Sequence, residues 1–82
     1  MKIEPRNKIE KFSLVMEERL RENDYRGTWE NERPEYLTKQ LIKNLDDLLE
    51  AMKSGNMATI PIECADIANY CMMIADYAGA LE

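Results

Sequence analysis

The sequence predicts an all-α protein, a three-helix protomer that forms an oligomeric helical bundle. Three segments carry apolar residues three or four positions apart, and no segment shows the strict alternation typical of a strand. With 82 residues, the chain is long enough for one domain, over residues 1–82. A lone domain of this size buries a thin core, so we expect association with further copies of the chain to complete that core.

The first helix is expected to begin near Pro5 and to end near Glu22. Proline is acceptable in a first helical turn, where its missing N–H would have no partner. Apolar residues recur at helical spacing among charged ones, at Ile9, Phe12, Met16 and Leu20. This amphipathic pattern predicts a surface helix. The polar segment 23–33 has one glycine and no periodicity, so it predicts a loop.

The second helix is expected to start at Pro34 and to end at Ser54-Gly55-Asn56, because glycine favours the position after a helix. Its predicted core stripe consists of Leu37, Leu41, Leu45, Leu48 and Met52. The third helix is expected to run from Thr59, as its N-cap, to about Ala80. Since its apolar residues cover nearly the whole circumference, we expect a second subunit to cover part of it.

Charge and hydropathy exclude several classes of function. The net charge of −5 argues against general nucleic-acid binding, which depends on neutralising phosphates. The first ten residues are mostly charged or polar, unlike a signal peptide. Acids and an amide interrupt the apolar C-terminal stretch, which argues against a membrane span. We therefore expect a cytoplasmic protein with neither a nucleic-acid nor a membrane partner.

The two cysteines predict neither a disulfide nor a zinc site. Cys64 and Cys71 lie seven residues apart on one predicted helix, with Cα atoms roughly 10 Å apart and out of disulfide reach. We expect both to be small buried side chains in a reducing compartment. The chain has no histidine, so zinc sites and histidine-containing di-iron sites lack their usual ligands.

The third predicted helix carries its few polar residues along one line. Glu63, Asp66 and Asn69 are three residues apart, and Asp76 follows seven residues later, so all four share a face. Buried carboxylates are costly unless a cation or hydrogen bonds compensate them. A divalent metal is the simplest compensation, and it points to chemistry on phosphates. The alternative is that the first two acids merely form an acidic first turn, which the helix dipole favours.

Asn44 and Asp47 form a second polar pair, at the edge of the leucine stripe of the second helix. If the second and third helices pack antiparallel, this pair approaches Glu63 and Asp66. Oxygen ligands from two facing helices suit Mg²⁺, or Mn²⁺ in its place. The metal would activate a water for attack on phosphorus, with a spare carboxylate as general base. The alternative for Asn44 and Asp47 is a solvated helix edge.

These residues resemble the MazG-like, all-α nucleoside triphosphate pyrophosphohydrolases, particularly the short single-domain phage and prophage forms. The resemblance covers residues 12–76 and rests on Glu63-Cys-Ala-Asp66-Ile-Ala-Asn69-Tyr and Met72-Met73-Ile-Ala-Asp76. Weaker support comes from Phe12, Met16-Glu17, Arg26-Gly27-Thr-Trp29 and Leu48-x-x-Ala51. The resemblance implies Mg²⁺-dependent conversion of a nucleoside triphosphate to the monophosphate and pyrophosphate.

The resemblance also assigns the two metal motifs of the family. The Glu-x-x-Asp motif falls on Glu63 and Asp66, and the Glu-x-x-Glu motif falls on Asn44 and Asp47. Asn44 places a neutral amide where the motif has a glutamate, and the Asp47 side chain is one methylene shorter than the second glutamate of the motif. Misplacing a metal by about 1 Å can cost roughly a hundredfold in rate, so weakened activity is expected.

Three further residues are expected to contact the substrate. Asn69 would orient the substrate or a neighbouring carboxylate, Arg26 would hold a phosphate, and Trp29 would stack on the base. The structural alternatives are an interface asparagine, an exposed loop arginine and a tryptophan that caps the core. The expected partners are a nucleoside triphosphate and further copies of the chain, in a dimer at least. Two other functions stay open. One is a catalytically silent helical module, which the neutral Asn44 favours. The other is the related phosphoribosyl-ATP pyrophosphatase.

Overall fold

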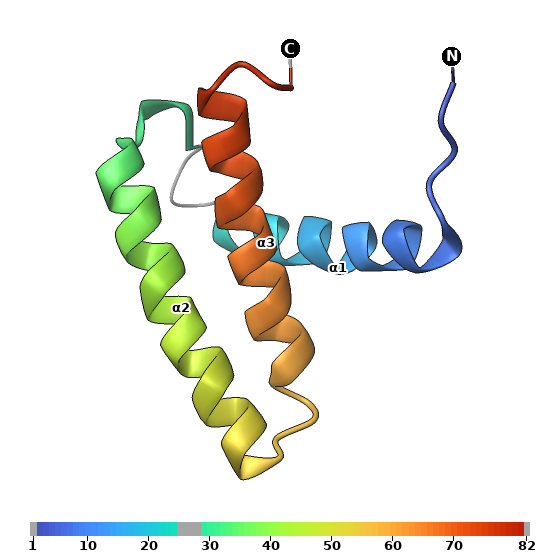
Figure 1. Cartoon of the computed structure of the whole chain (residues 1–82), viewed down its shortest axis with the longest axis vertical. Helices are drawn as coiled ribbons and strands as arrows, with labels where there is room; N and C mark the ends of the chain where they lie inside the picture. The colour runs from blue at the N-terminus through green and yellow to red at the C-terminus, as the bar shows by residue number, and fades with distance from the viewer. Residues whose placement is uncertain (1, 25–28, 82) are drawn as a thin grey trace.

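A helical protomer is seen in the computed structural model, which describes residues 2–24 and 29–81. Its elements are α1 (Asn7–Asn23), the 3₁₀ turn η2 (Trp29–Asn31), α2 (Pro34–Ser54) and α3 (Ile60–Tyr77). Figure 1 shows α2 and α3 as an antiparallel pair, with α1 lying across α3. No strand occurs among the described residues, so the predicted all-α class and the three predicted helices are confirmed.

The ends of α2 follow the turn chemistry of its sequence. Pro34 opens the helix directly after the extended Arg33. Gly55 closes it in the left-handed conformation (φ 70°), from which its N–H reaches the carbonyls of Ala51 and Met52. A β-carbon would be strained at this φ, so the glycine sets the position where the chain turns back. The short turn that follows makes α3 antiparallel to α2.

The ends of the other two helices differ from the prediction. The first residue of α1 comes after Pro5, because Arg6 is still extended (φ −63°, ψ 152°). Thr59 precedes α3 as predicted, but its side chain makes no capping hydrogen bond. The side-chain oxygen of Asn56 instead accepts a hydrogen bond from the Thr59 N–H, at 3.2 Å. α3 ends at Tyr77, earlier than the predicted end near residue 80.

The protomer has a thin core between α2 and α3. Its buried residues, among those described, are Leu37, Ala51, Ala65 and Asn69. The two alanines leave room for α2 and α3 to approach closely. The predicted leucine stripe is only partly right, because Leu45 is 43% exposed and Met52 is 59% exposed. Within one protomer these two side chains lie outside the core.

A second apolar stripe runs along a face of α2 that α3 does not cover. We call it the α2 outer stripe, and its exposed members are Ile42, Leu45, Leu49 and Met52. Their spacing of three, four and three residues places them on one helix face. The radius of gyration is 13.7 Å, whereas a compact chain of this length has about 12 Å. The protomer is therefore extended and leaves a continuous apolar face uncovered.

Two expectations about the apolar helix α3 can be compared with the structure. Both cysteines are free thiols, as predicted. Cys64 is half-buried, but Cys71 is exposed, so the prediction that both are buried is wrong for Cys71 in the protomer. Over the described residues, neither α3 nor any other helix has the length and hydropathy needed to cross a bilayer.

Candidate functional site

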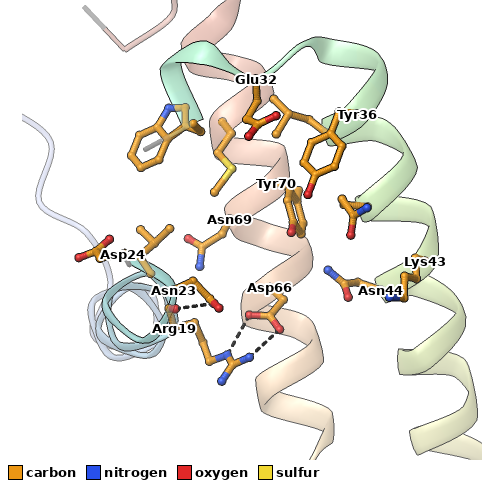
Figure 2. A pocket seen from close by; sticks show the side chains of 15 residues that line it. Arg19, Asn23, Asp24, Glu32, Tyr36, Lys43, Asn44, Asp66, Asn69 and Tyr70 are labelled. Carbon is orange, nitrogen blue, oxygen red and sulfur yellow. Dashed lines mark hydrogen bonds and ion pairs between the residues drawn. The ribbon is translucent and has the colours of Figure 1, made fainter. Parts of the chain in front are cut away.

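Two residues of the polar line of α3, Asp66 and Asn69, border a cavity between the three helices. The cavity has a volume of about 310 Å³, within the range of small-molecule sites. Figure 2 shows Arg19, Asp66 and Asn44 toward one end, and Glu32 and Tyr36 toward the other. One end therefore carries charged and amide groups, and the other carries a carboxylate beside an aromatic ring.

Asp66 is held by Arg19 of α1. Arg19 Nε donates to Asp66 Oδ1 at 2.9 Å, and Arg19 Nη2 donates to Asp66 Oδ2 at 3.1 Å. The Arg19 guanidinium also pairs with Glu22 on its own helix. The hydrogen bonds with Asp66 raise the pKa of Arg19 above its ordinary value, against the opposing effect of burial. Both carboxylate oxygens of Asp66 are thus engaged, and the ion pair ties α1 to α3.

Glu63, one turn before Asp66, has an unsatisfied carboxylate. Its Oε2 atom is buried and finds no hydrogen-bond partner within the described part of the chain. Burial raises the pKa of the Glu63 carboxyl, the charges of Asp47 and Asp66 raise that pKa further, and Arg19 lowers it. The charges of Asp47 on α2 and Asp66 on α3 thus both act on Glu63. Such a group of acids is the kind of environment that a bound cation relieves.

The donor chemistry of this acid cluster, Asp47, Glu63 and Asp66, fits Mg²⁺, which prefers carboxylate oxygens and waters. The unpartnered oxygen of Glu63 is the atom most in need of a cation. The three acids do not converge on one point, however. In residues 2–24 and 29–81, no three Asp, Glu or Cys side chains lie close enough together to hold a metal ion. Asp66 pairs with Arg19 instead.

The predicted pair on α2 divides between cavity and solvent. Asn44 is half-buried and lines the same cavity as Asp66, and Figure 2 shows it on the facing helix. Asp47 is exposed, one turn further along α2. The alternative of a solvated helix edge therefore describes Asp47 better than Asn44.

Asn69 is the buried polar residue of the described chain, only 3% exposed. Its Nδ2 donates a hydrogen bond to the carbonyl oxygen of Met16 at 3.0 Å, which links α3 to α1. Its Oδ1 is buried without a hydrogen-bond partner among the described residues. Asn69 lines the cavity, and a buried amide oxygen without a partner is costly, so a donor that reached this oxygen would stabilise the fold.

Trp29 is anchored by the last acid of the polar line. Its Nε1 donates to Asp76 Oδ2 at 2.9 Å, which joins η2 to the end of α3. Trp29 borders the main cavity and a smaller hollow of about 170 Å³. Asp76 thus positions the tryptophan, and the tryptophan both caps the fold and faces the cavity. Arg26, which we expected to hold a phosphate, lies outside the described residues.

Sequence reasoning did not single out two basic residues of the cavity, Arg19 and Lys43. Each looks like a solvated residue of an amphipathic helix when the helix is considered alone. A signal for Arg19 exists, since it lies three residues after Met16 and next to Leu20, at the edge of the apolar face. That position points its side chain toward whatever element α1 crosses.

Comparisons with protein-family models, curated proteins and solved structures find no match to this chain. Any function proposed for the chain therefore rests on its own residues and geometry.

Proposed function

We propose that the protein is a Mg²⁺-dependent, MazG-like hydrolase that converts a nucleoside triphosphate to the monophosphate and pyrophosphate. What supports this proposal is a buried oxygen of Glu63 that has no partner among the described residues, together with the charges of Asp47 and Asp66, which raise the pKa of that carboxyl. Asp47, Glu63 and Asp66 would hold the metal, with Asn44 as a weak ligand. The bound ion would neutralise the polyphosphate and lower the pKa of an attacking water.

The two ends of the cavity suit the two parts of a nucleotide. Arg19 and Lys43 supply positive charge near Asp66, where a polyphosphate would lie. Trp29 and Tyr36 provide aromatic surface for a base. The free oxygen of Asn69 would accept a hydrogen bond from an N–H group of the base or an O–H group of the sugar. The basic and aromatic groups of the lining support a nucleotide as the proposed ligand, whereas Asp24, Glu32 and Asp66 oppose a free polyphosphate.

The second candidate function is a catalytically silent helical module that binds nucleotide or assembles with other subunits. One observation favours it specifically. Arg19 already neutralises Asp66 and donates hydrogen bonds to both carboxylate oxygens of Asp66. In addition, Asn44 has a neutral amide where the resemblance would place a carboxylate.

Pyrophosphate release separates the two functions. We expect the purified protein to release pyrophosphate from one or more ribo- or deoxyribonucleoside triphosphates with Mg²⁺ or Mn²⁺, and to stop when EDTA is added. Release from none of the eight common nucleotides, with a folded protein confirmed by circular dichroism, would favour the silent module.

We further infer that the working form is a homo-oligomer, a dimer at least, in which a second copy covers the α2 outer stripe. The uncovered stripe and the extended protomer support this inference. A chain that buries so few side chains lacks the apolar burial that a stable domain needs. Identical stripes meeting about a twofold axis would bury one another, as in most small homodimers.

Asn44→Glu is expected to increase both metal binding and hydrolysis. The added carboxylate faces the acid cluster, so without metal we expect a loss of about 0.5 kcal/mol through like-charge repulsion. With Mg²⁺ at a hundred times its dissociation constant, mass action adds about 2.7 kcal/mol, and we expect hydrolysis to rise roughly tenfold or more. Melting temperatures with and without Mg²⁺, beside pyrophosphate release, measure both effects.

The control for this variant is Asn7→Glu, the same substitution at an exposed residue at the start of α1. It should leave the Mg²⁺-induced change in melting temperature unaltered. If Asn44→Glu behaves like this control, residue 44 does not face the metal, and the silent module becomes the better proposal.

A further inference from the structure

We propose that the cavity binds a small organic ammonium ion, a primary amine on an apolar stem, at the end that carries Trp29, Glu32 and Tyr36. Such a ligand needs no metal, and its binding does not rest on hydrolysis of a nucleotide. The groups that would recognise it are carboxylates, aromatic rings and a buried amide oxygen, all of which belong to the cavity wall.

The charge of the cavity wall favours a cation once the internal ion pair is set aside. Arg19 and Asp66 both line the cavity, and they neutralise each other through two hydrogen bonds. Of the other described residues of the wall, Asp24 and Glu32 are acidic and Lys43 is basic. Within the described chain, no hydrogen bond or ion pair engages either of these two carboxylates. Carboxylates without a partner attract a cation and repel an anion.

The smaller hollow beside the cavity adds to this negative charge. It shares Trp29 and Glu32 with the cavity, and its wall also contains the acids Glu30 and Asp76. No basic residue of the described chain lines it. Figure 2 shows Lys43 on α2, away from Glu32. The whole chain has a net charge of −5, so its long-range field also draws cations toward this end.

Aromatic and apolar surface selects an organic cation over a simple alkali ion. Trp29 and Tyr36 both line the cavity, while Leu37 and Met73 line the cavity and the smaller hollow. The face of an aromatic ring is negative, so it attracts an ammonium ion and covers an apolar stem at the same time. A hydrated alkali ion has no apolar surface to bury and gains little from such a wall.

The ring of Trp29 is fixed before any ligand arrives. Its Nε1–H donates to Asp76 Oδ2 at 2.9 Å, which holds the indole between η2 and α3. Because the ring is already oriented, it loses little side-chain entropy when a ligand binds. The carboxylate on the indole N–H also polarises the ring, and the added electron density strengthens its attraction for a cation.

A buried acceptor favours a ligand that carries N–H groups. Asn69 is only 3% exposed and lines the cavity, and its Oδ1 has no hydrogen-bond partner among the described residues. Figure 2 shows its side chain projecting from α3 toward the side of the cavity where Asp24 lies. An ammonium N–H that reached this oxygen would satisfy it. The oxygens of an ionised phosphate or carboxylate are acceptors only, so they would not.

The chain carries its own reporter, because Trp29 is the single tryptophan. Titration of the full chain with butylammonium chloride, at constant ionic strength, should give a saturable change in Trp29 fluorescence at millimolar concentrations. Butanol keeps the stem and loses the charge, so it should bind at least about tenfold more weakly. No saturable change with butylammonium, or equal binding of butanol, would overturn the proposal.

Tetramethylammonium tests the role of the buried acceptor, since it keeps the charge and has no N–H group. It should bind about threefold more weakly than butylammonium. Binding as tight as that of butylammonium would overturn the requirement for N–H groups, and with it the assignment of Asn69 to the ligand.

Two variants at exposed positions locate the site without threatening the fold. Glu32→Gln removes a carboxylate from the cavity wall and should weaken butylammonium binding about three- to fivefold. The matched control is Glu35→Gln, at an exposed residue that lines neither the cavity nor the smaller hollow. It removes the same charge and should change the affinity less than about 1.5-fold. Equal effects of both variants would indicate general attraction by the net charge and overturn the proposal.

The ammonium site and the proposed hydrolase are tested by separate measurements. Saturable binding of butylammonium by a protein that releases no pyrophosphate would support the ammonium site and count against the hydrolase. Pyrophosphate release by a protein whose Trp29 fluorescence does not respond to butylammonium would do the reverse.

Discussion

Glu63→Gln is expected to abolish pyrophosphate release, by a factor of about 100 or more, and to make the metal-free protein more stable. Both effects arise from the half-buried carboxylate of Glu63, whose Oε2 atom is buried. The amide of glutamine is a weaker Mg²⁺ ligand than the carboxylate it replaces. A metal that binds weakly or shifts slightly lowers the rate strongly, because catalysis depends on its exact position. Without metal, the same change removes a negative charge that faces Asp47 and Asp66, while the shape of the side chain is retained.

Glu63 should make the protein less stable as the pH rises. The pKa of Glu63 is raised in the fold above its ordinary value of 4.5, so the folded state binds this proton more tightly than the unfolded state does. Its stabilising contribution is therefore complete below about pH 4.5 and is lost as the pH rises through the folded-state pKa. In thermal melts without metal, the stability of the natural protein relative to Glu63→Gln should fall as the pH rises above about 4.5.

The control for Glu63→Gln is Glu10→Gln, at an exposed position on α1. Figure 1 shows that the N-terminal half of α1 projects away from the α2–α3 pair, and thus from the site. This variant should keep both hydrolysis and the Mg²⁺-induced rise in melting temperature. If Glu63→Gln keeps the Mg²⁺-induced rise as well, Glu63 does not bind the metal.

Local patterns predicted the helices because they depend on neighbouring residues. Pro34 and Gly55 mark the two ends of α2 through backbone preferences that operate in any context. The assignment of Leu45 and Met52 to the core was wrong for the protomer, because apolar spacing identifies a face without identifying the surface that covers it. In α2, two neighbouring apolar faces exist, and only one meets α3.

The candidate site was predictable where it lies on one helix. Glu63, Asp66 and Asn69 appear as a line in the sequence, and the structure places all three where α3 meets its neighbours. The contact of Arg19 with Asp66 joins residues 47 positions apart. It depends on how α1 crosses α3, and no local pattern encodes that crossing. The hydrogen bond between Trp29 and Asp76 escaped prediction for the same reason.

If the protein is the homo-oligomer proposed above, Leu49→Asp is expected to convert it to a monomer and to unfold most of the protein at micromolar concentration. Leu49 is 56% exposed in the protomer, so an aspartate there costs little within one chain. In an oligomer joined through the α2 outer stripe, the charge would be buried without a partner, at a cost of about 3 kcal/mol. Light scattering should give at least twice 9.6 kDa for the natural protein and about 9.6 kDa for the variant.

The control is Leu14→Asp, the same substitution at a 68% exposed leucine on α1, outside the α2 outer stripe. It should leave the mass unchanged. Loss of the partner also removes the apolar burial that the thin protomer core lacks, so the Leu49→Asp monomer should have little helical circular dichroism. The melting temperature of the natural protein should rise with protein concentration, since association stabilises only the folded chain. A natural protein of 9.6 kDa with a concentration-independent melt would show that this small core suffices and that the stripe serves another purpose.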